Sequence, residues 1–370
     1  MNKTVVIGMS GGVDSSVSAM LLKQQGYRVI GMFMKNWEEK DENGVCRSSF
    51  DYDDVRKVCD QIDIPYYSVN FVKDYWDQVF TQFVEDFKKG LTPNPDVLCN
   101  REIKFKVFLE KAMEIGADYL ATGHYCQNLE VEGSPSLVKG LDGNKDQTYF
   151  LYTLNQNILK KVLFPIGHLE KSEVRELARK HSLATSEKKD STGICFIGKR
   201  DFREFLSQYI PAQPGNFETL QGKIVGKHFG TAFYTLGQRK GLGIGGAGEA
   251  WFVVKKDIER NVVIVEQGAD HAALYCDELI ASDLSWVANT PPALPFTCQA
   301  KVRYRQTDQE CQVEAINQGC AKVTFPSAQR AVTPGQSIVF YDGPICLGGG
   351  IIRQVGQSYF EMNRQVPSEK

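Results

Sequence analysis

The chain has no long hydrophobic run, no CxxC motif and no recognisable leader. None of its apolar stretches approaches the roughly 20 residues that a membrane-spanning helix needs. Its ten cysteines include no CxxC pair, which disfavours a zinc knuckle and a CxxC redox centre. The N-terminal MNKTVVIGM runs into a strand-like segment without a cleavable signal or an Arg-rich transit peptide. These absences predict a cytoplasmic protein whose cysteines are mostly reduced and buried.

The chain also lacks a large net charge of either sign. Lysine and arginine number 43 against 45 aspartates and glutamates, a net charge of −2. That balance argues neither for nor against binding to nucleic acid, because a large enzyme can be neutral overall and basic on one face. With 42% hydrophobic and 24% charged residues, the composition is typical of a folded globular protein. At 370 residues the chain is too long for one ordinary core, so we expect two or three domains.

The first half of the chain alternates strand-like and helix-like segments. Strands are expected at 4–9, 28–34, 65–71 and 117–125, and helices at 14–25, 54–62, 74–89, 104–116 and 172–183. This alternation predicts a doubly wound parallel sheet covered by helices, with ligand sites at the carboxyl ends of the strands. In the last helix, Ser172 is the expected N-cap, and Arg175 stands where a capping box would need Glu or Gln.

After about residue 210 the sequence becomes rich in short β segments. PAQPGNF, 211–217, reads as a linker, and further strands are expected at 222–226, 232–237, 251–257, 261–267, 296–305, 312–316, 321–325, 336–343 and 346–355. Their short spacing is typical of small β domains and barrels. We therefore predict a catalytic α/β domain over 1–205, a small β-rich domain over 206–280 and a barrel-like domain over 281–364.

The segment SGGVDS, residues 10–15, follows the first strand and opens a helix. Glycines allow close approach of a phosphate, serine hydroxyls can bind it, and the helix N-terminus supplies N–H groups and positive potential. A Walker loop would add a lysine, whereas this loop carries Asp14 instead, a residue suited to holding Mg²⁺. The alternative is a glycine turn that only caps the helix.

Two cysteines lie in polar loops with basic neighbours. Cys99 belongs to TPNPDVLCNREIKF, where prolines favour an extended backbone and Arg101 and Lys104 could lower the pKa of a thiol. Cys195 belongs to SEKKDSTGICFIGKRDF and has cations on both sides. Both cysteines are therefore candidates for nucleophilic chemistry, the alternative being buried inert thiols.

Taken together, these stretches resemble the tRNA-specific 2-thiouridylase family of the PP-loop ATP pyrophosphatases. The resemblance spans essentially the whole chain, through GMSGGVDSSV, TPNPDVLCNREIKF, ATGHY, KDQTYFL, KKDSTGICFIG, YTLGQRKGLGIGG, VRYR and PGQ. It implies an adenine nucleotide alpha hydrolase-like fold. It also implies ATP-dependent 2-thiolation of the wobble uridine in tRNAs for Lys, Glu and Gln, with release of AMP and pyrophosphate.

The resemblance also implies roles for the two cysteines. Cys99 would be the nucleophile and Cys195 the carrier of a persulfide, with a transient disulfide between them. A cysteine desulfurase or a sulfur-relay protein would supply the sulfur. Asp96 is our own hypothesis for an acid/base group beside the base, the alternative being a turn or capping aspartate.

The same resemblance implies two binding surfaces. ATP, as its Mg²⁺ complex, would contact Gly8, Met9, Ser10, Gly11, Gly12, Val13, Asp14, Ser15, Met34 and Gly123. The tRNA would contact Asn94, Pro95, Asp96, His124, Lys145, Asp146, Gln147, Tyr304, Arg305 and Gln336. Within KVRYR we expect a strand whose Lys301, Arg303 and Arg305 share one face, opposite Tyr304.

Other functions remain open from the residues alone. Another PP-loop enzyme, such as a tRNA-lysidine synthetase or an amide-forming synthetase, would use the same loop without two sulfur-bearing cysteines. An iron–sulfur thiolase is disfavoured because the chain has no CxxC. A non-catalytic tRNA-binding protein with a relic nucleotide loop would bind RNA without releasing pyrophosphate.

Overall fold

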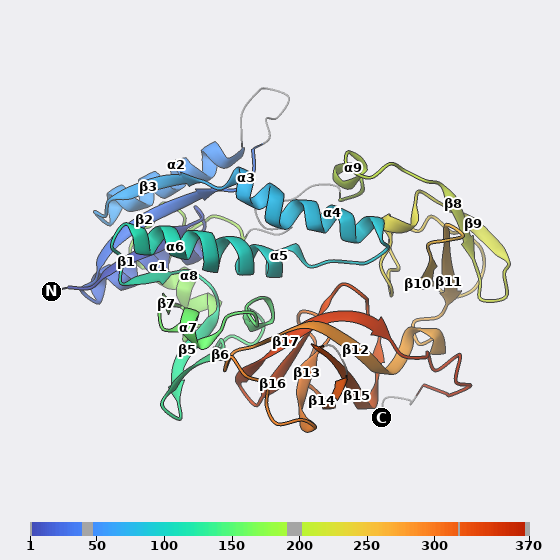
Figure 1. Ribbon diagram of the computed structural model, residues 1–370. Coiled ribbons are helices and arrows are strands. Elements are labelled where there is room, and N and C mark those ends of the chain that lie inside the picture. The colour runs from blue at the N-terminus through green and yellow to red at the C-terminus, as the bar shows by residue number, and fades with distance from the viewer. Residues whose placement is uncertain (1, 39–46, 191–201, 317–318, 367–370) are drawn as a thin grey trace.

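The computed structural model describes residues 2–38, 47–190, 202–316 and 319–366, whose strands form three sheets (Figure 1). The first sheet has the order β3-β2-β1-β4-β7, and every neighbouring pair in it is parallel. Its strands are β1 (Thr4–Met9), β2 (Arg28–Lys35), β3 (Tyr66–Asn70), β4 (Tyr119–Ala121) and β7 (Val162–Leu163). This confirms the predicted parallel sheet, and β7 adds a strand that the sequence had not indicated.

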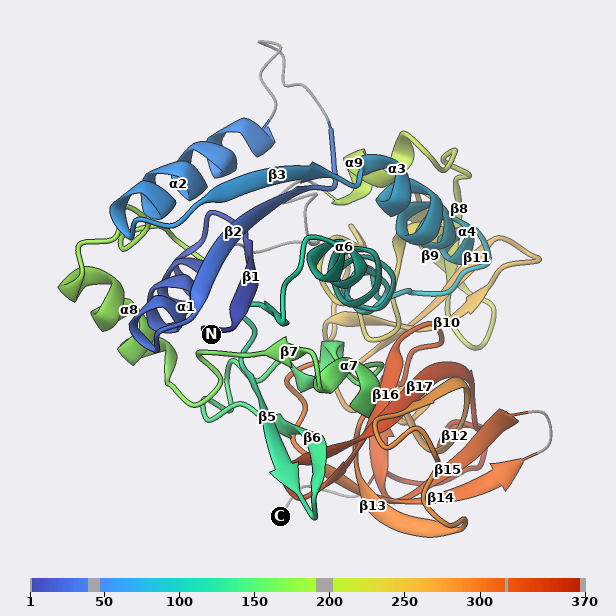
Figure 2. The same ribbon diagram turned by 60° about the vertical axis from the view of Figure 1, so that its left-hand side comes forward.

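Helices cover both faces of this sheet. Val6 of β1 packs in a cluster with residues of η2 (Cys99–Val107) and α6 (Phe108–Glu114). Its neighbours Val5 and Ile7 pack in another cluster, with residues of α1 (Val13–Gln24) and α2 (Arg47–Gln61). Because successive side chains of a strand point to opposite faces, these clusters lie on opposite sides, as Figure 2 shows. The doubly wound arrangement is confirmed.

Two long helical runs cross the molecule between the sheet and the rest of the chain. The expected helix at 74–89 comprises α3 (Val72–Tyr75), a π-helical turn η1 (Trp76–Phe80) and α4 (Thr81–Lys88). The helix expected from 104 begins earlier, at α5 (Pro95–Leu98), and continues through η2 and α6. Asn94 caps it by accepting a hydrogen bond from the Asp96 N–H, and Pro95 occupies the first helical position. Pro95 therefore starts a helix, and the extended backbone predicted for this stretch ends at Asn94.

Helix α8 (Lys171–Lys180) begins differently from the prediction. Its N-cap is Glu170, not Ser172. Glu170 and Glu173 form a capping box, in which the Glu173 carboxylate accepts from the Glu170 N–H at 2.7 Å. The pattern was missed because glutamate is an uncommon N-cap.

The second sheet has the order β10-β11-β8-β9 and follows α9 (Phe202–Ser207). Its strands are β8 (Gly215–Glu218), β9 (Ile224–His228), β10 (Trp251–Asp257) and β11 (Val262–Gln267). The predicted linker over 211–217 already contains the start of β8. The strand predicted at 232–237 is absent from this described region, where the short helix η4 (Thr231–Phe233) leads into a loop instead.

Six strands of the third sheet close into a barrel, as predicted. They follow the order β12-β15-β14-β13-β16-β17, and pairing of β12 with β17 closes the ring. Their bounds are β12 (Tyr275–Trp286), β13 (Phe296–Lys301), β14 (Gln309–Ile316), β15 (Cys320–Arg330), β16 (Ser337–Asp342) and β17 (Ile345–Val355). Strand β12 was not predicted, because register shifts at Cys276/Glu278 and beyond break its alternation of buried and exposed residues.

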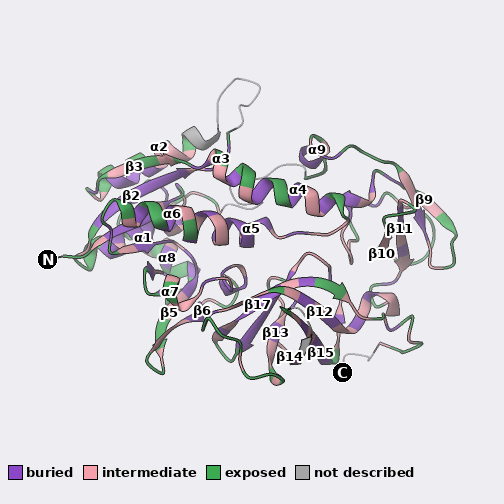
Figure 3. Ribbon diagram, in the orientation of Figure 1, coloured by how far each residue is buried: buried purple, intermediate pink, exposed green. Residues whose placement is uncertain are grey.

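The barrel also joins the first half of the chain. The hairpin of β5 (Cys126–Val131) and β6 (Ser134–Lys139) extends the barrel sheet, with Val138 opposite Ile345 of β17. Short helices η3 (Thr148–Phe150) and α7 (Gln156–Leu159) follow it. Buried residues run along β1, β2 and β16, whereas α4 and α6 alternate buried and exposed positions (Figure 3). Within the described ranges, no helix is both long enough and apolar enough to span a bilayer.

Candidate functional site: a phosphate loop and a buried thiol

The loop after β1 has the geometry of a phosphate site. Gly11 has φ +73°, and a Cβ added there would lie 2.6 Å from the Asp51 carbonyl oxygen. Gly12 is the N-cap of α1, and no side chain of the described region caps this helix end. A Cβ on Gly123, beyond β4, would lie 2.9 Å from the Ser15 nitrogen. Close packing therefore requires glycine at positions 11 and 123. The first N–H groups of α1 remain available to an anion.

The serine hydroxyls hold the loop from inside. The Ser10 N–H donates to Ser15 Oγ at 3.2 Å, and Ser15 Oγ donates to the Gly12 carbonyl at 3.1 Å. Ser16 Oγ donates to the same carbonyl at 2.8 Å and accepts from Thr185 Oγ1 at 2.9 Å. The loop is therefore organised before any ligand arrives, which lowers the entropy lost on binding.

A lysine of helix α8 lies beside this loop. Lys171 Nζ lies 2.6 Å from Asp14 Oδ1, and only 11% of its side chain is exposed. The Tyr125 hydroxyl donates to the same oxygen at 2.8 Å, and burial followed by the Asp14 charge raises the pKa of Tyr125. Sequence reasoning missed Lys171. The signal that could have found it is a lysine at the start of a helix predicted to pack on the sheet.

Asp190 joins this lysine to two further cations. Its carboxylate contacts Lys145 at 2.8 Å, Lys171 at 3.1 Å and Arg175 at 2.5 Å. Burial acts to raise the pKa of Asp190, but hydrogen bonds from Lys145 and Lys171 outweigh it, and the pKa falls to about 2. One charged network therefore connects Asp14 of the loop with Lys145, a predicted tRNA contact.

Cys195 lies outside the described residues, and so do its nearest neighbours. Of the cations expected around it, Lys188 and Lys189 are described. The Lys188 ammonium lies 2.8 Å from Asp51 and 2.7 Å from Asp54, on α2. The charge of Lys188 is therefore balanced by carboxylates, and the segment leading to Cys195 is tied to the wall of the phosphate loop.

Cys99 is completely buried at the first position of η2. It belongs to the same cluster as Met34, at the carboxyl end of β2, and Leu98. Arg101 donates at 2.8 Å to both Glu102 and Asp283. Because Asp283 is part of β12, this ion pair links the helix of the thiol to the barrel, and the Arg101 charge is balanced by two carboxylates.

The KDQ segment is held largely by its own polar side chains. Asp146 is buried and accepts hydrogen bonds from the Gly140 N–H at 3.1 Å and from Thr148 Oγ1 at 2.9 Å. Gln147 Oε1 accepts from the Tyr125 N–H at 2.9 Å. Lys145 extends to Asp190. In this arrangement the side chains of Asp146 and Gln147 make hydrogen bonds within the protein. Their contacts with tRNA stay a prediction.

His124 is buried beside the aromatic ring of Phe105, and its Nδ1 lies 2.8 Å from Thr122 Oγ1. Burial, aided by the charge of Lys104, lowers the pKa of His124 well below its usual range. The ring is therefore neutral at pH 7 and carries no positive charge for a phosphate. A role for His124 in binding tRNA stays a prediction.

The predicted strand face in KVRYR is wrong. Strand β13 ends at Lys301, and 302–305 form a bend and a turn in which Arg305 has φ +65°. A turn does not keep the two-residue alternation of a strand, so the three cations do not share a face. Lys301 points inward, 3.7 Å from Asp308, whereas Arg303 and Arg305 are exposed.

Tyr304 and Gln336 connect the barrel to the first half of the chain. The Tyr304 ring packs 4.5 Å from that of Phe150, whose carbonyl accepts from the Asn100 amide at 2.9 Å. Gln336 Nε2 donates to the Thr92 carbonyl at 2.7 Å, and the Thr92 N–H donates to Pro334 at 2.9 Å. The barrel thus holds the chain on both sides of the Asn94–Cys99 segment, at Thr92 through Gln336 and at Arg101 through Asp283.

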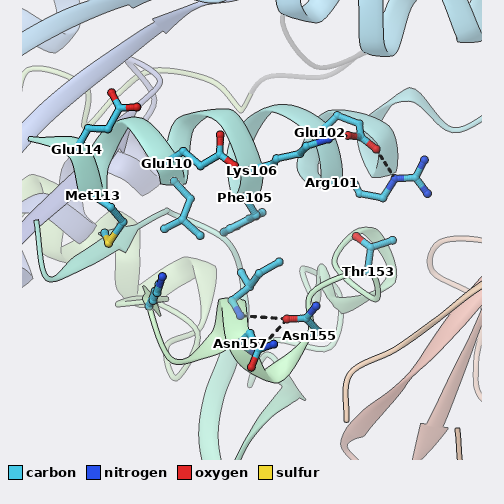
Figure 4. A pocket seen from close by; sticks show the side chains of 13 residues that line it. Arg101, Glu102, Phe105, Lys106, Glu110, Met113, Glu114, Thr153, Asn155 and Asn157 are labelled. Atoms are coloured by element: carbon cyan, nitrogen blue, oxygen red, sulfur yellow. Dashed lines mark hydrogen bonds and ion pairs between the residues drawn. The ribbon is translucent and has the colours of Figure 1, made fainter. Parts of the chain in front are cut away.

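A groove of about 750 Å³ runs along η2 and α6, opposite residues 153–161 (Figure 4). Three carboxylates line it, those of Glu102, Glu110 and Glu114, beside an apolar floor that includes Phe105 and Met113. Three cations, Arg101, Lys106 and Lys161, line it as well, so the charges in the groove are balanced. None of the lining residues belongs to the phosphate loop.

Three family models match successive parts of the chain. Residues 3–199 match the model described as tRNA methyl transferase HUP domain, 203–267 the tRNA methyl transferase PRC-barrel domain, and 276–352 the aminomethyltransferase beta-barrel domain. The curated tRNA-specific 2-thiouridylase MnmA of Protochlamydia amoebophila is 74% identical over 99% of this chain and 98% of its own length. The protein of the same name from Listeria innocua is 60% identical over 97% of both chains.

Two solved structures show weaker likeness. NMN synthetase from Francisella tularensis aligns with 51% of this chain and 67% of its own, at 16% identity and a TM-score of 0.32. A 4-thiouridine synthetase–RNA complex with bound ATP aligns with 56% of this chain and 50% of its own, at 16% identity and a TM-score of 0.35.

Proposed function

The chain belongs to the tRNA-specific 2-thiouridylase family, and from that premise we propose that it catalyses ATP-dependent 2-thiolation of the wobble uridine in tRNA. The observation that carries the proposal is the phosphate loop after β1, with a helix start that no described side chain caps and Lys171 beside Asp14, in a chain whose Cys99 lies buried at the start of η2. An adenylating site and a nucleophilic thiol would thus belong to one α/β domain. The expected division at 1–205, 206–280 and 281–364 forms part of the proposal.

The phosphate loop would bind ATP through Gly8–Ser15, with Met34 and Gly123 beside it. The uridine C2 oxygen would attack the α-phosphorus, and pyrophosphate would leave from the N-terminus of α1, where N–H groups stabilise negative charge. Lys171 would neutralise the developing charge, the role that a loop lysine plays elsewhere. Mg²⁺ bound to the phosphates would supply further charge neutralisation. Asp14, in the first turn of α1, is the carboxylate of the loop that would hold it.

Sulfur transfer would then use the two cysteines. The terminal sulfur of a Cys195 persulfide would replace the activated oxygen at C2, directly or after release as hydrosulfide, and AMP would leave with that oxygen. Cys99 would attack Sγ of Cys195, giving a disulfide that a thiol reductant must open by supplying two electrons. Asp96, in the first turn of α5, would serve as acid/base group, and Asn94 and Pro95 would border the target base. A desulfurase or relay protein would reload Cys195.

Mass spectrometry of tRNA nucleosides tests this proposal. Unmodified tRNA for Lys, Glu or Gln is incubated with ATP, Mg²⁺, a sulfide source and either the wild type or Cys195→Ala. We expect 2-thiouridine at the wobble position, with AMP formed in equal amount. When a cysteine desulfurase replaces the sulfide source, we expect thiolation to require Cys195. AMP without thiolation would indicate another PP-loop ligase. Binding of tRNA without AMP would indicate a non-catalytic protein.

A further inference from the structure

The segment Leu236–Gly248, with the sequence LGQRKGLGIGGAG, has no part in the function proposed above. We call it the glycine loop. It connects η4 to β10, and most of it from Arg239 onward is exposed to solvent, with Leu242 as its buried anchor. Its sequence contains two cations, Arg239 and Lys240, and no acidic residue.

The base of this loop is well ordered. Gln238 Oε1 accepts from the Thr235 N–H at 3.0 Å, and the Gln238 carbonyl accepts from the Val253 N–H at 3.0 Å. The Gly237 N–H donates back to the Val253 carbonyl at 2.8 Å. These bonds fix the direction in which Arg239 and Lys240 leave the sheet. The backbone just before the two cations is therefore held in one position by hydrogen bonds.

That base lies against the segment that leads to Cys99. Thr235 Oγ1 is 3.4 Å from Thr92 Oγ1, two residues before Asn94. A Cβ on Gly237 would lie 2.7 Å from the Ala331 side chain, just beyond β15 of the barrel. Asp96 follows Thr92 by four residues, and Arg239 follows Thr235 by four. Each of these two stretches of chain therefore spans at most about 14 Å. Arg239 thus lies within roughly 35 Å of Asp96, a distance that about ten stacked nucleotides cover.

Within the described ranges, the cations of this loop have no acidic partner. Among the residues that the structure describes, neither Arg239 nor Lys240 takes part in an ion pair, in contrast to Lys171 or Arg101. A hollow of about 320 Å³ beside them contains one carboxylate, that of Glu249. Beneath the loop, Arg203 donates to the Gly241 carbonyl at 3.2 Å, and its guanidinium lies 5.8 Å from the Phe229 ring. Exposed cations beside an aromatic side chain suit a polyanion that also carries bases.

The loop backbone is open to close approach. A Cβ on Gly245 would meet no atom within 4 Å, and this residue is not among those with a left-handed backbone. The fold therefore does not require glycine at this position. A backbone without side chains is what a sugar–phosphate chain can approach closely.

We propose that the glycine loop binds the sugar–phosphate backbone of the tRNA substrate, with Arg239 and Lys240 on phosphates within about ten nucleotides of the one whose base enters the site. The inference rests on the proposed function, because it takes the tRNA as ligand. It adds a surface of the middle sheet to those of the barrel and the Asn94–Cys99 segment. The contact recognises backbone charge, so it contributes affinity and registration without reading the base sequence.

The test is a salt titration of tRNA binding. Wild type, Arg239→Ala/Lys240→Ala and Gly245→Glu are compared by fluorescence anisotropy with labelled unmodified tRNA. We expect the double variant to bind about tenfold more weakly at low salt, with a slope of log Kd against log salt lower by about 1.5, since each phosphate contact contributes about 0.7–0.9. Gly245→Glu, whose side chain enters open space, should weaken binding several-fold. The KM for tRNA should rise in parallel, while ATP affinity stays unchanged.

Arg179→Ala/Lys180→Ala, which removes the same charge from the far end of α8, is the control and should bind tRNA as the wild type does. Equal Kd and equal salt slope for the glycine-loop variants would overturn the proposal. Unchanged tRNA binding with slower sulfur transfer from a desulfurase would also overturn it and would assign the loop to a protein partner. If the wild type itself neither binds nor thiolates tRNA, the proposed function fails, and this outcome is separate from failure of the loop alone.

Discussion

The phosphate loop and the Asn94–Cys99 segment are positioned in opposite ways. The hydrogen bonds of Ser10, Ser15 and Ser16 run mostly within the loop or to the first turn of α1, so this region is organised by neighbouring residues. The thiol segment is instead held from distant parts of the chain, by Phe150, Asp283, Pro334 and Gln336. Nucleotide binding should therefore tolerate changes in the barrel, whereas sulfur transfer should not.

The largest expected effect comes from the thiol itself. Cys99→Ser should abolish formation of 2-thiouridine, because a hydroxyl is too weak a nucleophile to attack Sγ of Cys195 and free the terminal sulfur, while ATP and tRNA binding persist. Nucleoside mass spectrometry measures the product. Cys320→Ser, a change on the barrel, is the control and should thiolate normally. Residual thiolation by Cys99→Ser with Cys195 intact would show that Cys99 is not the nucleophile.

Lys171→Ala should lower the rate of pyrophosphate release by about 10²–10³-fold, the usual cost of removing one donor that stabilises transition-state charge. A coupled pyrophosphate assay measures it. Because the change also leaves Asp14 and Asp190 without their shared cation, thermal unfolding must be recorded alongside. Lys180→Ala, at the exposed end of the same helix, should leave the rate unchanged. A Lys171→Ala enzyme of normal rate and normal stability would show that the loop works without a lysine.

Gln336→Ala should separate the two regions most directly. Losing the hydrogen bond to the Thr92 carbonyl, worth about 1 kcal/mol, should lower thiolation several-fold while ATP affinity stays unchanged. Steady-state kinetics with tRNA and with ATP measure the two effects. Gln354→Ala, an exposed position on β17, is the matched control. A fall in ATP affinity with intact thiolation would reverse the proposed division of roles.

The smallest effect concerns Asp190. Its folded-state pKa of about 2 lies below the unfolded value of 3.8, so its contribution to stability is present above pH 3.8 and lost as the pH falls toward 2. Asp190→Asn should therefore reduce the pH dependence of the free energy of unfolding between pH 4 and pH 2, measured by urea denaturation. An unchanged acid slope would mean that the cations around Asp190 do not lower its pKa.

Much of the fold was predictable because it follows local patterns. Strands β1 and β2 are apolar runs, and α4 and α8 have clear amphipathic periods. The prediction failed where another part of the chain decides the structure. Strand β12 lost its alternation to bulges, KVRYR became a turn at the end of β13, and the hairpin β5–β6 joined the sheet of a distant barrel.

The sequence by itself determined the phosphate loop, since glycines, serines and a helix start act within a few residues, and it singled out Cys99 and Cys195 by their neighbours. Only the tertiary structure decided which charges meet. It brought Lys171 from α8 to Asp14, turned Arg101 toward Asp283 and placed Gln336 on Thr92. Ion pairs and hydrogen bonds between residues far apart in the chain depend on how sheets and helices pack, and no local pattern encodes that packing.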